Sequence, residues 1–288
     1  MHPFLLYAGR FALLVLTFSS YAHPKDLDTS MIGPTIAFEL RSDFLVVVNG
    51  EVEGLAGLKF IVDTGSTHTV IDRKIANKLR LPRHPGKVST FDRDTPAEWA
   101  DINDLRAGPI RASSASVMVM RLAEYSELAK NVDGIIGLDL LSRGKKLTID
   151  YERRALSFEL GKNGAGENLP AGAFAVPIVV QGLRMHLLVD TGCQGMLLYR
   201  NRLRNRLPSL SIVGESRTGV IGRLGATQVN LPGVKIGGLE KMATVLLIDG
   251  PKHGDLLGVD GYLGPASLHA KRIEFDFATR TLRWVLEP

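Results

Sequence analysis

Short apolar runs broken by glycine dominate the hydropathy pattern of the chain. Two pairs of such runs stand out: 44–50 with 58–62, and 175–182 with 185–189. Apolar runs of this length with glycine between them are typical of β-strands joined by tight turns. Each pair therefore predicts a β-hairpin, and an aspartate, Asp63 or Asp190, follows the second strand of each hairpin.

The segments that follow the two hairpins also correspond. A short helix is predicted after each hairpin, over 73–80 and 200–206, because a Leu-Pro dipeptide follows each segment and proline is a common helix stop. Each half then ends in a further predicted strand pair: 147–151 with 155–158, and 273–277 with 281–285. The same order of elements thus occurs twice.

The correspondence is sharpest in two short sequence motifs, which we call the triplet and the second word. Asp-Thr-Gly begins at Asp63 and again at Asp190, 127 residues later, and each copy is followed 70 residues on by an Asp-Gly word, at Asp133 and at Asp260. One Asp-Thr-Gly triplet alone is an ordinary turn sequence. Two triplets in the same setting, with matched downstream words, predict an internal duplication that places one carboxylate in each copy.

Composition supports a β-rich globular protein. The chain has 288 residues, of which 45% are hydrophobic and 23% charged, and its 30 glycines suit the many turns of an all-β fold. A glycine-rich stretch separates the two copies. We therefore expect an N-terminal lobe over 33–160, a linker over 161–173 and a C-terminal lobe over 174–288.

The first 22 residues have the pattern of a secretory signal peptide. Arg10 precedes the apolar stretch 11–18, and Ser20 and Ala22 supply the small residues of a cleavage site. Cys193 is the only cysteine, so the exported chain forms no intramolecular disulfide. This combination favours a periplasmic or secreted bacterial protein with no stable membrane anchor after cleavage.

The net charge of +5 is mild, and the densest group of basic residues is one arginine cluster. Arginines at 200, 202, 204 and 206 form this cluster. Such a cluster can bind nucleic acid, but no aromatic platform accompanies it, so a solvated helix face is the favoured interpretation. We expect no nucleic-acid partner.

The two triplets resemble those of the aspartic protease superfamily, and in particular of bacterial, exported, retropepsin-like proteins with two lobes in one chain. The resemblance covers about residues 40–288 and includes the words Ile135-Ile136-Gly137 and Tyr262-Leu263-Gly264. It implies an all-β, two-lobed pepsin/retropepsin fold with a pseudo-twofold axis. It also implies that Asp63 and Asp190 meet at the floor of a cleft and hydrolyse a peptide or protein substrate.

The chemistry of such a pair follows from electrostatics. Two carboxylates held close together cannot both ionise cheaply, so they share one proton. The ionised member accepts a proton from a water molecule, and the protonated member polarises the carbonyl of the peptide bond. This reaction needs no metal or cofactor, and none is expected.

Six further residues of the triplet loops have expected supporting roles. The glycines Gly65 and Gly192 allow tight turns that bring backbone N–H groups to the carboxylates. By resemblance, Thr64 and Thr191 exchange hydrogen bonds between the lobes. Ser66 is expected to donate its hydroxyl to Asp63, whereas Cys193, a poorer donor, takes the equivalent place beside Asp190 and makes the two halves chemically unequal.

Other candidate residues have alternative interpretations. A nucleophilic role for Cys193 is disfavoured because the adjacent carboxylate suppresses its thiolate. His68 has no second histidine or cysteine at ligand spacing, so a structural role is favoured. Asp133 and Asp260 precede glycines, and we expect them to shape turns.

A substrate-covering hairpin is expected between the triplet and the second word of one or both copies. The candidates are 90–105, which contains Trp99, and the glycine-spaced segment 219–225. Packing is the alternative role of Trp99.

Two competing functions remain open at the level of sequence. In one, the duplicated scaffold binds a peptide or an envelope protein with weak catalysis or none, a possibility that rests on Cys193. In the other, the chain is an obligate dimer in which each half pairs with the same half of a second chain. A monomer is favoured because the two halves are already tethered.

Overall fold

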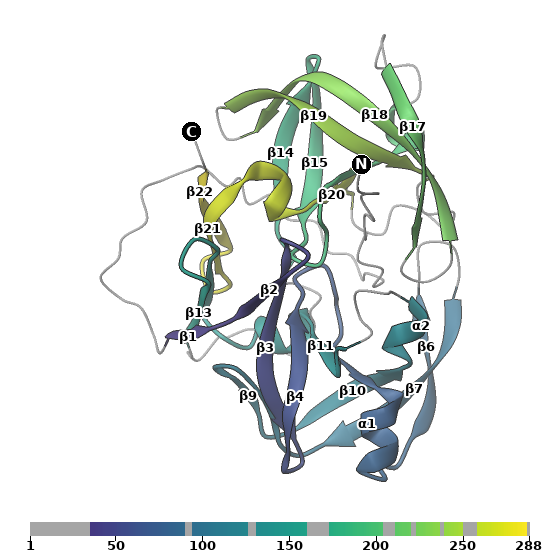
Figure 1. Ribbon diagram of the computed structural model, residues 1–288, viewed down its shortest axis with the longest axis vertical. Helices are drawn as coiled ribbons and strands as arrows, with labels where there is room; N and C mark the ends of the chain where they lie inside the picture. The colour runs from purple at the N-terminus through teal and green to yellow at the C-terminus, as the bar shows by residue number, and fades with distance from the viewer. Residues whose placement is uncertain are drawn as a thin grey trace.

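Strands predominate in the computed structural model, which describes residues 35–89, 94–125, 131–159, 173–203, 211–219, 223–236, 239–249 and 258–286. The predicted all-β, two-lobed fold is confirmed. In Figure 1 the purple-to-teal strands of the N-terminal lobe lie below the green strands of the C-terminal lobe. The predicted signal peptide and nearly all of the predicted linker lie outside the described residues.

A large sheet forms most of the N-terminal lobe. In their order across the sheet, its strands are β6 (His84–Ser89), β7 (Asp94–Ile102), β10 (Ala115–Met120), β5 (Val70–Asp72), β11 (Gly134–Ile136), β4 (Leu55–Val62), β3 (Leu45–Val52), β8 (Leu105–Ala107) and β9 (Ile110–Ala112), with β2 (Glu39–Arg41) also paired to β3.

The C-terminal lobe is built on a second sheet that curls onto itself. Its strands, in order, are β14 (Ala175–Val180), β15 (Leu183–Val189), β20 (Gly261–Leu263), β16 (Met196–Tyr199), β19 (Leu239–Ile248), β18 (Arg223–Ile236) and β17 (Ser211–Gly219). An additional pairing between β14 and β18 closes this sheet.

The two predicted hairpins that precede the triplets are confirmed as β3–β4 and β14–β15. Each has a two-residue turn, Glu53-Gly54 or Gln181-Gly182, in which both residues have positive φ (48° and 79°; 48° and 83°). Turns of this kind match the right-handed twist of the flanking strands and therefore fix the register of the hairpin. The register determines where each second strand ends and its aspartate begins.

The second words form two short strands, β11 and β20, each paired with the strand that leads to a triplet. Strand β11 pairs parallel with β4 and antiparallel with β5, and β20 pairs parallel with β15 and antiparallel with β16. Gly137 and Gly264 follow these strands at positions where an added Cβ would collide with backbone atoms of the triplet loops. Glycine is therefore required where the end of the second word packs against the triplet loop of the same lobe.

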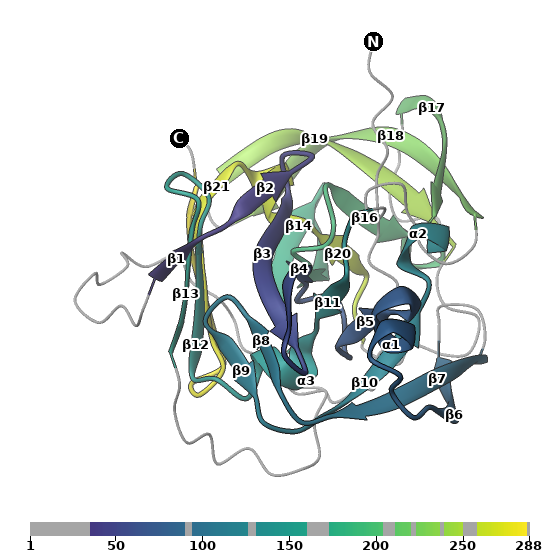
Figure 2. The ribbon, with the colours of Figure 1, turned by 60° about the horizontal axis from the view of Figure 1, so that its bottom comes forward.

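A third sheet joins the lobes. Its strands, in order, are β1 (Thr35–Ala37), β13 (Ala155–Glu159), β12 (Lys146–Asp150), β21 (Ala270–Asp276) and β22 (Thr281–Leu286). The two predicted closing strand pairs are thus confirmed, and β12 of one lobe pairs antiparallel with β21 of the other, with Ile149 opposite Ile273. Figure 2 shows this sheet along one side of the molecule, with yellow β21 beside teal β12 and β13.

Helices are few and short in the described residues. They are α1 (Arg73–Lys78), α2 (Leu122–Tyr125), α3 (Leu138–Leu141), α4 (Arg200–Leu203) and the 3₁₀ helix η2 (Pro265–Leu268). Helix α1 confirms the first predicted helix: the Asp72 side chain accepts a hydrogen bond from the Lys74 N–H at its start, and Arg80, with φ of 52°, lies just past its end. Residues 204–206 of the second predicted helix lie outside the described residues. None of the helices described is long and apolar enough to cross a membrane.

Candidate active site

The two aspartates occupy equivalent places in the lobes. Asp63 follows the last residue of β4, and its N–H donates to the carbonyl of Ile136 at 3.0 Å. Asp190 follows β15, and its N–H donates to the carbonyl of Leu263, also at 3.0 Å. Each aspartate is therefore held by a main-chain bond to the second word of its own lobe.

The structure brings Asp63 and Asp190 together. A Cβ added to Gly192 would lie 2.7 Å from Asp63 Oδ2, and one added to Gly65 would lie even nearer to the carboxyl group of Asp190. The glycine of each triplet thus lies against the carboxyl group of the opposite lobe. Backbone N–H groups complete the arrangement, because Gly65 donates to Asp63 Oδ1 at 2.8 Å and Gly192 donates to Asp190 Oδ1 at 2.7 Å.

Burial controls the electrostatics of this pair. Only 4% of Asp63 and none of Asp190 is exposed to solvent. This burial raises the pKa of Asp63, although hydrogen bonds from Asp190 and from the N–H groups of Gly65, Ser66 and Gly192 act in the opposite direction. One proton shared by two buried carboxyl groups is the state that this environment favours.

The threonines of the triplets lock the two loops together, as predicted. The N–H of Thr64 donates to Thr191 Oγ1 at 3.0 Å, and the N–H of Thr191 donates to Thr64 Oγ1 at 3.1 Å. Each hydroxyl in turn donates to a carbonyl of the other lobe: Thr64 to Val189 at 2.9 Å, and Thr191 to Val62 at 2.8 Å. Four buried hydrogen bonds therefore fix the distance between the lobes at the dyad.

Comparison with known proteins is consistent with this geometry. Residues 48–140, which include the first triplet and its second word, match the sequence model of a family described as aspartyl protease. This match covers 93 of the 288 residues.

Two solved structures are similar to this chain over part or most of its length. A retropepsin-like aspartic protease from Rickettsia conorii is 20% identical, with a TM-score of 0.31 over 44% of this chain and 90% of that one. Basic 7S globulin from soybean is 11% identical, with a TM-score of 0.45 over 85% of this chain and 94% of that one. No curated protein matches the chain.

The predicted role of Ser66 is wrong. Its hydroxyl donates to the carbonyl of His68 at 2.7 Å, and only its backbone N–H donates to Asp63 Oδ1, at 3.2 Å. Cys193 behaves in the same way, because its thiol donates to the carbonyl of Gly195 at 3.3 Å. Both side chains bind the carbonyl two residues further on, so the cysteine does not make the dyad unequal through a lost bond to Asp190.

A nucleophilic role for Cys193 finds no support in its surroundings. The thiol is buried, and burial together with the charge of Asp190 raises its pKa well above the usual value. A thiol in this environment stays protonated and inert.

The environment of His68 is that of a packed side chain. Its ring lies edge-on to Trp99, with 5.0 Å between ring centroids, and burial lowers its pKa. The described residues contain no cluster of three His, Cys, Asp or Glu side chains that could hold a metal ion. Asp139 lies near His68; Thr69 donates to its Oδ1 at 2.7 Å, and burial raises its pKa.

Asp133 and Asp260 have a role that the sequence did not reveal. Asp133 Oδ2 accepts the N–H of Lys59 on β4 at 2.8 Å, and Asp260 Oδ2 accepts the N–H of His186 on β15 at 2.8 Å. Each carboxylate therefore holds the strand that ends just before Asp63 or Asp190. Their matched positions before the second words are the signal in the sequence, and the structure adds these strand contacts to the predicted turns.

Antiparallel strand pairs are present in both lobes at the positions where a covering hairpin is expected. They are β6–β7 and β17–β18, and their tips, 90–93 and 220–222, lie outside the described residues. Trp99 lies on β7, half-buried against His68 and the nearby apolar face of the N-terminal sheet. Its contacts in the described residues are packing contacts.

The arginine cluster is partly described. Arg200 donates to Thr227 Oγ1 at 2.9 Å and forms an ion pair with Asp249, and Arg202 pairs with Asp260 at 3.9 Å. Arg204 and Arg206 lie outside the described residues. The two described arginines are thus engaged with the chain itself.

The threonine lock gives a testable expectation for stability. Thr64→Val leaves the carbonyl of Val189 and the N–H of Thr191 buried without these partners, so we expect the free energy of unfolding to fall by about 2–4 kcal/mol. Thr64→Ser keeps the hydroxyl and should cost about 1 kcal/mol, for the lost methyl group. Urea denaturation measures both values, and equal losses in the two variants would contradict the role of the hydroxyl.

Proposed function

We propose that the chain is an aspartic endopeptidase in which Asp63 and Asp190 together activate water to hydrolyse peptide bonds. The observation that carries the proposal is the reciprocal packing of the dyad, in which the glycine of each triplet abuts the carboxyl group of the other lobe. This packing supports a pair of carboxyl groups that share a proton at the junction of two lobes.

The proposed reaction follows from that shared proton. The ionised carboxylate accepts a proton from water as the water oxygen attacks the carbon of the peptide bond. The protonated carboxyl group donates a hydrogen bond to the carbonyl oxygen, on which negative charge develops. The tetrahedral intermediate then collapses, the C–N bond breaks and the nitrogen leaves with a proton from the dyad.

The activity is proposed for a monomer that acts in the periplasm or outside the cell. The monomer is supported by the presence of both aspartates in one chain, and export by the signal-like pattern over 1–22. The competing binding-module interpretation rested on the unequal loops around Ser66 and Cys193. Both side chains donate to the carbonyl two residues further on, so this difference between the loops no longer supports the binding module.

Cleavage as a function of pH tests the proposed function. We expect residues 23–288 to cut a diverse peptide mixture with a bell-shaped dependence of kcat/KM between about pH 3 and pH 8, because the dyad must hold one proton. Since burial raises the pKa of Asp63, the rate should fall on the alkaline side only at pH values above the usual range of a free carboxyl group.

Mass spectrometry of the products identifies the cut sites, and pepstatin inhibition adds support. Peptide binding without cleavage over this whole pH range, by folded protein, would overturn the proposal in favour of the binding module.

A further inference from the structure

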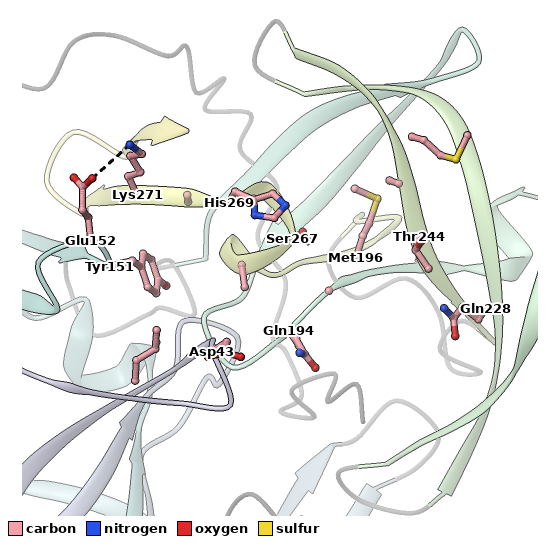
Figure 3. A pocket seen from close by; sticks show the side chains of 16 residues that line it. Asp43, Tyr151, Glu152, Gln194, Met196, Gln228, Thr244, Ser267, His269 and Lys271 are labelled. Carbon is pink, nitrogen blue, oxygen red and sulfur yellow. Dashed lines mark ion pairs between the residues drawn. The ribbon is translucent and has the colours of Figure 1, made fainter. Parts of the chain in front are cut away.

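A cavity of about 800 Å³ lies between the lobes beside the second triplet loop. Gln194 and Gly195, which directly follow Cys193, form part of its wall. The N-terminal lobe contributes Asp43, from the turn between β2 and β3, and Tyr151, from the turn between β12 and β13. Figure 3 shows Asp43 and Tyr151 of the N-terminal lobe and Gln194 of the C-terminal lobe among the side chains around the cavity.

The charges that line this cavity are unequal. Lys271 is paired with Glu152, with 3.4 Å between Nζ and Oε1, as the dashed line in Figure 3 marks. Asp43 has no ion-pair or hydrogen-bond partner among the residues that the structure describes. Among the Asp, Glu and Lys side chains that line the cavity, only Asp43 is therefore left without an opposite charge.

A second polar group of the cavity also lacks a partner. The hydroxyl oxygen of Tyr151 is buried and makes no hydrogen bond within the described part of the chain. Burial, reinforced by the charge of Asp190, raises the pKa of this phenol, so it stays protonated and can still accept a hydrogen bond from a donor. Buried polar groups without partners are uncommon and point to a missing polar neighbour.

The rest of the wall suits a long aliphatic stem. Met196 and Met242 line the cavity, and Met242 is 67% exposed, an unusual position for a large apolar side chain. Methionine adapts its shape to varied apolar partners. Lysine and arginine combine such a stem with a charged group that only donates hydrogen bonds.

We propose that this cavity receives a lysine or arginine side chain of a peptide substrate, and that Asp43 selects it. The inference rests on the proposed endopeptidase function, because the occupant is a substrate bound across both lobes. The cation of this side chain pairs with the carboxylate of Asp43. The selected residue occupies one fixed position relative to the bond that is cut.

The test compares arginine with citrulline, which has nearly the same shape but no charge. Peptide pools with either residue fixed at successive positions are cut by wild type, by Asp43→Asn and by the control Asp249→Asn. Asp249 is an exposed carboxylate outside the cavity, so its variant makes the same charge change elsewhere.

We expect wild type to prefer arginine over citrulline at one position by about three- to tenfold in kcat/KM, as fits one partly exposed ion pair. Asp43→Asn should abolish most of this preference, Asp249→Asn should keep it, and added salt should weaken it. An equal effect of Asp43→Asn on arginine and citrulline peptides would overturn the proposed role of Asp43, while cleavage itself would still support the endopeptidase.

If wild type cuts no peptide, a binding measurement tests the selective cavity separately from the proposed endopeptidase activity. The same pools, labelled with a fluorophore, are then titrated with wild type and with Asp43→Asn, and the dissociation constants are measured by anisotropy. Tighter binding of the arginine pool that depends on Asp43 supports the selective cavity without catalysis. Equal binding of both pools rejects it.

Discussion

Asp63→Asn and Asp190→Asn are each expected to lower kcat/KM for peptide cleavage by about 10³-fold or more while the fold is retained. An amide cannot accept the proton of water, and it cannot share a proton with the remaining carboxylate, so one substitution removes both halves of the acid–base cycle. Loss of general acid–base catalysis alone accounts for about 10²–10⁴-fold. Substantial residual cleavage in both single variants would contradict the dyad mechanism.

The stability of Asp63→Asn provides the control for folding. Because burial raises the pKa of Asp63 in the folded protein, the folded state retains a proton that the unfolded chain loses as the pH rises past the usual carboxyl range. The free energy of unfolding of the wild type therefore falls as the pH rises from the usual carboxyl pKa to the raised pKa of Asp63. At higher pH it does not recover. We expect Asp63→Asn to melt a few degrees higher than wild type near pH 7, with the difference shrinking as the pH falls toward about 4.

Gly65→Ala should be the most damaging change of a single methyl group in the triplet loops. The added Cβ would overlap the carboxyl group of Asp190, so either the loop or the carboxyl group must move. A displacement of about 1 Å in a catalytic group can cost about 10²-fold in rate. We expect a loss of that size in kcat/KM and a fall of about 1–3 kcal/mol in the free energy of unfolding.

Gly54→Ala is the matched control for Gly65→Ala. Gly54 has a φ of 79° and open space where a Cβ would be added, so alanine there meets backbone strain without a collision. This variant should lose about 1–2 kcal/mol of stability and keep its rate of cleavage. If the two variants lost activity equally, the close approach of Gly65 to Asp190 would not explain the effect.

Local sequence signals predicted the framework of the site well. The hairpins before Asp63 and Asp190 could be predicted because their registers depend on short apolar runs and on two-residue turns that contain glycine. Helix α1 was predictable for the same reason, since its cap and its stop lie within its own segment. The second words form β11 and β20, for which the sequence pattern predicts no strand.

Contacts between neighbouring side chains were harder to predict. The hydroxyl of Ser66 can reach either Asp63 or the carbonyl of His68, and the local backbone decides between them. The anchoring bonds of Asp133 and Asp260 join residues 74 positions apart, so no local pattern reveals them. The cavity that contains Asp43 and Tyr151 depends on how the lobes pack, which the sequence pattern leaves undetermined.

The sheet that joins the lobes has a consequence for the order of synthesis. One edge of β12 is paired with β13, but its other edge pairs with β21, which is made more than a hundred residues later. Until β21 emerges, the nascent N-terminal lobe presents an open edge of backbone donors and acceptors, which can pair with another chain. Truncated or stalled chains should therefore aggregate or need a chaperone at this edge, and only the completed chain conceals it.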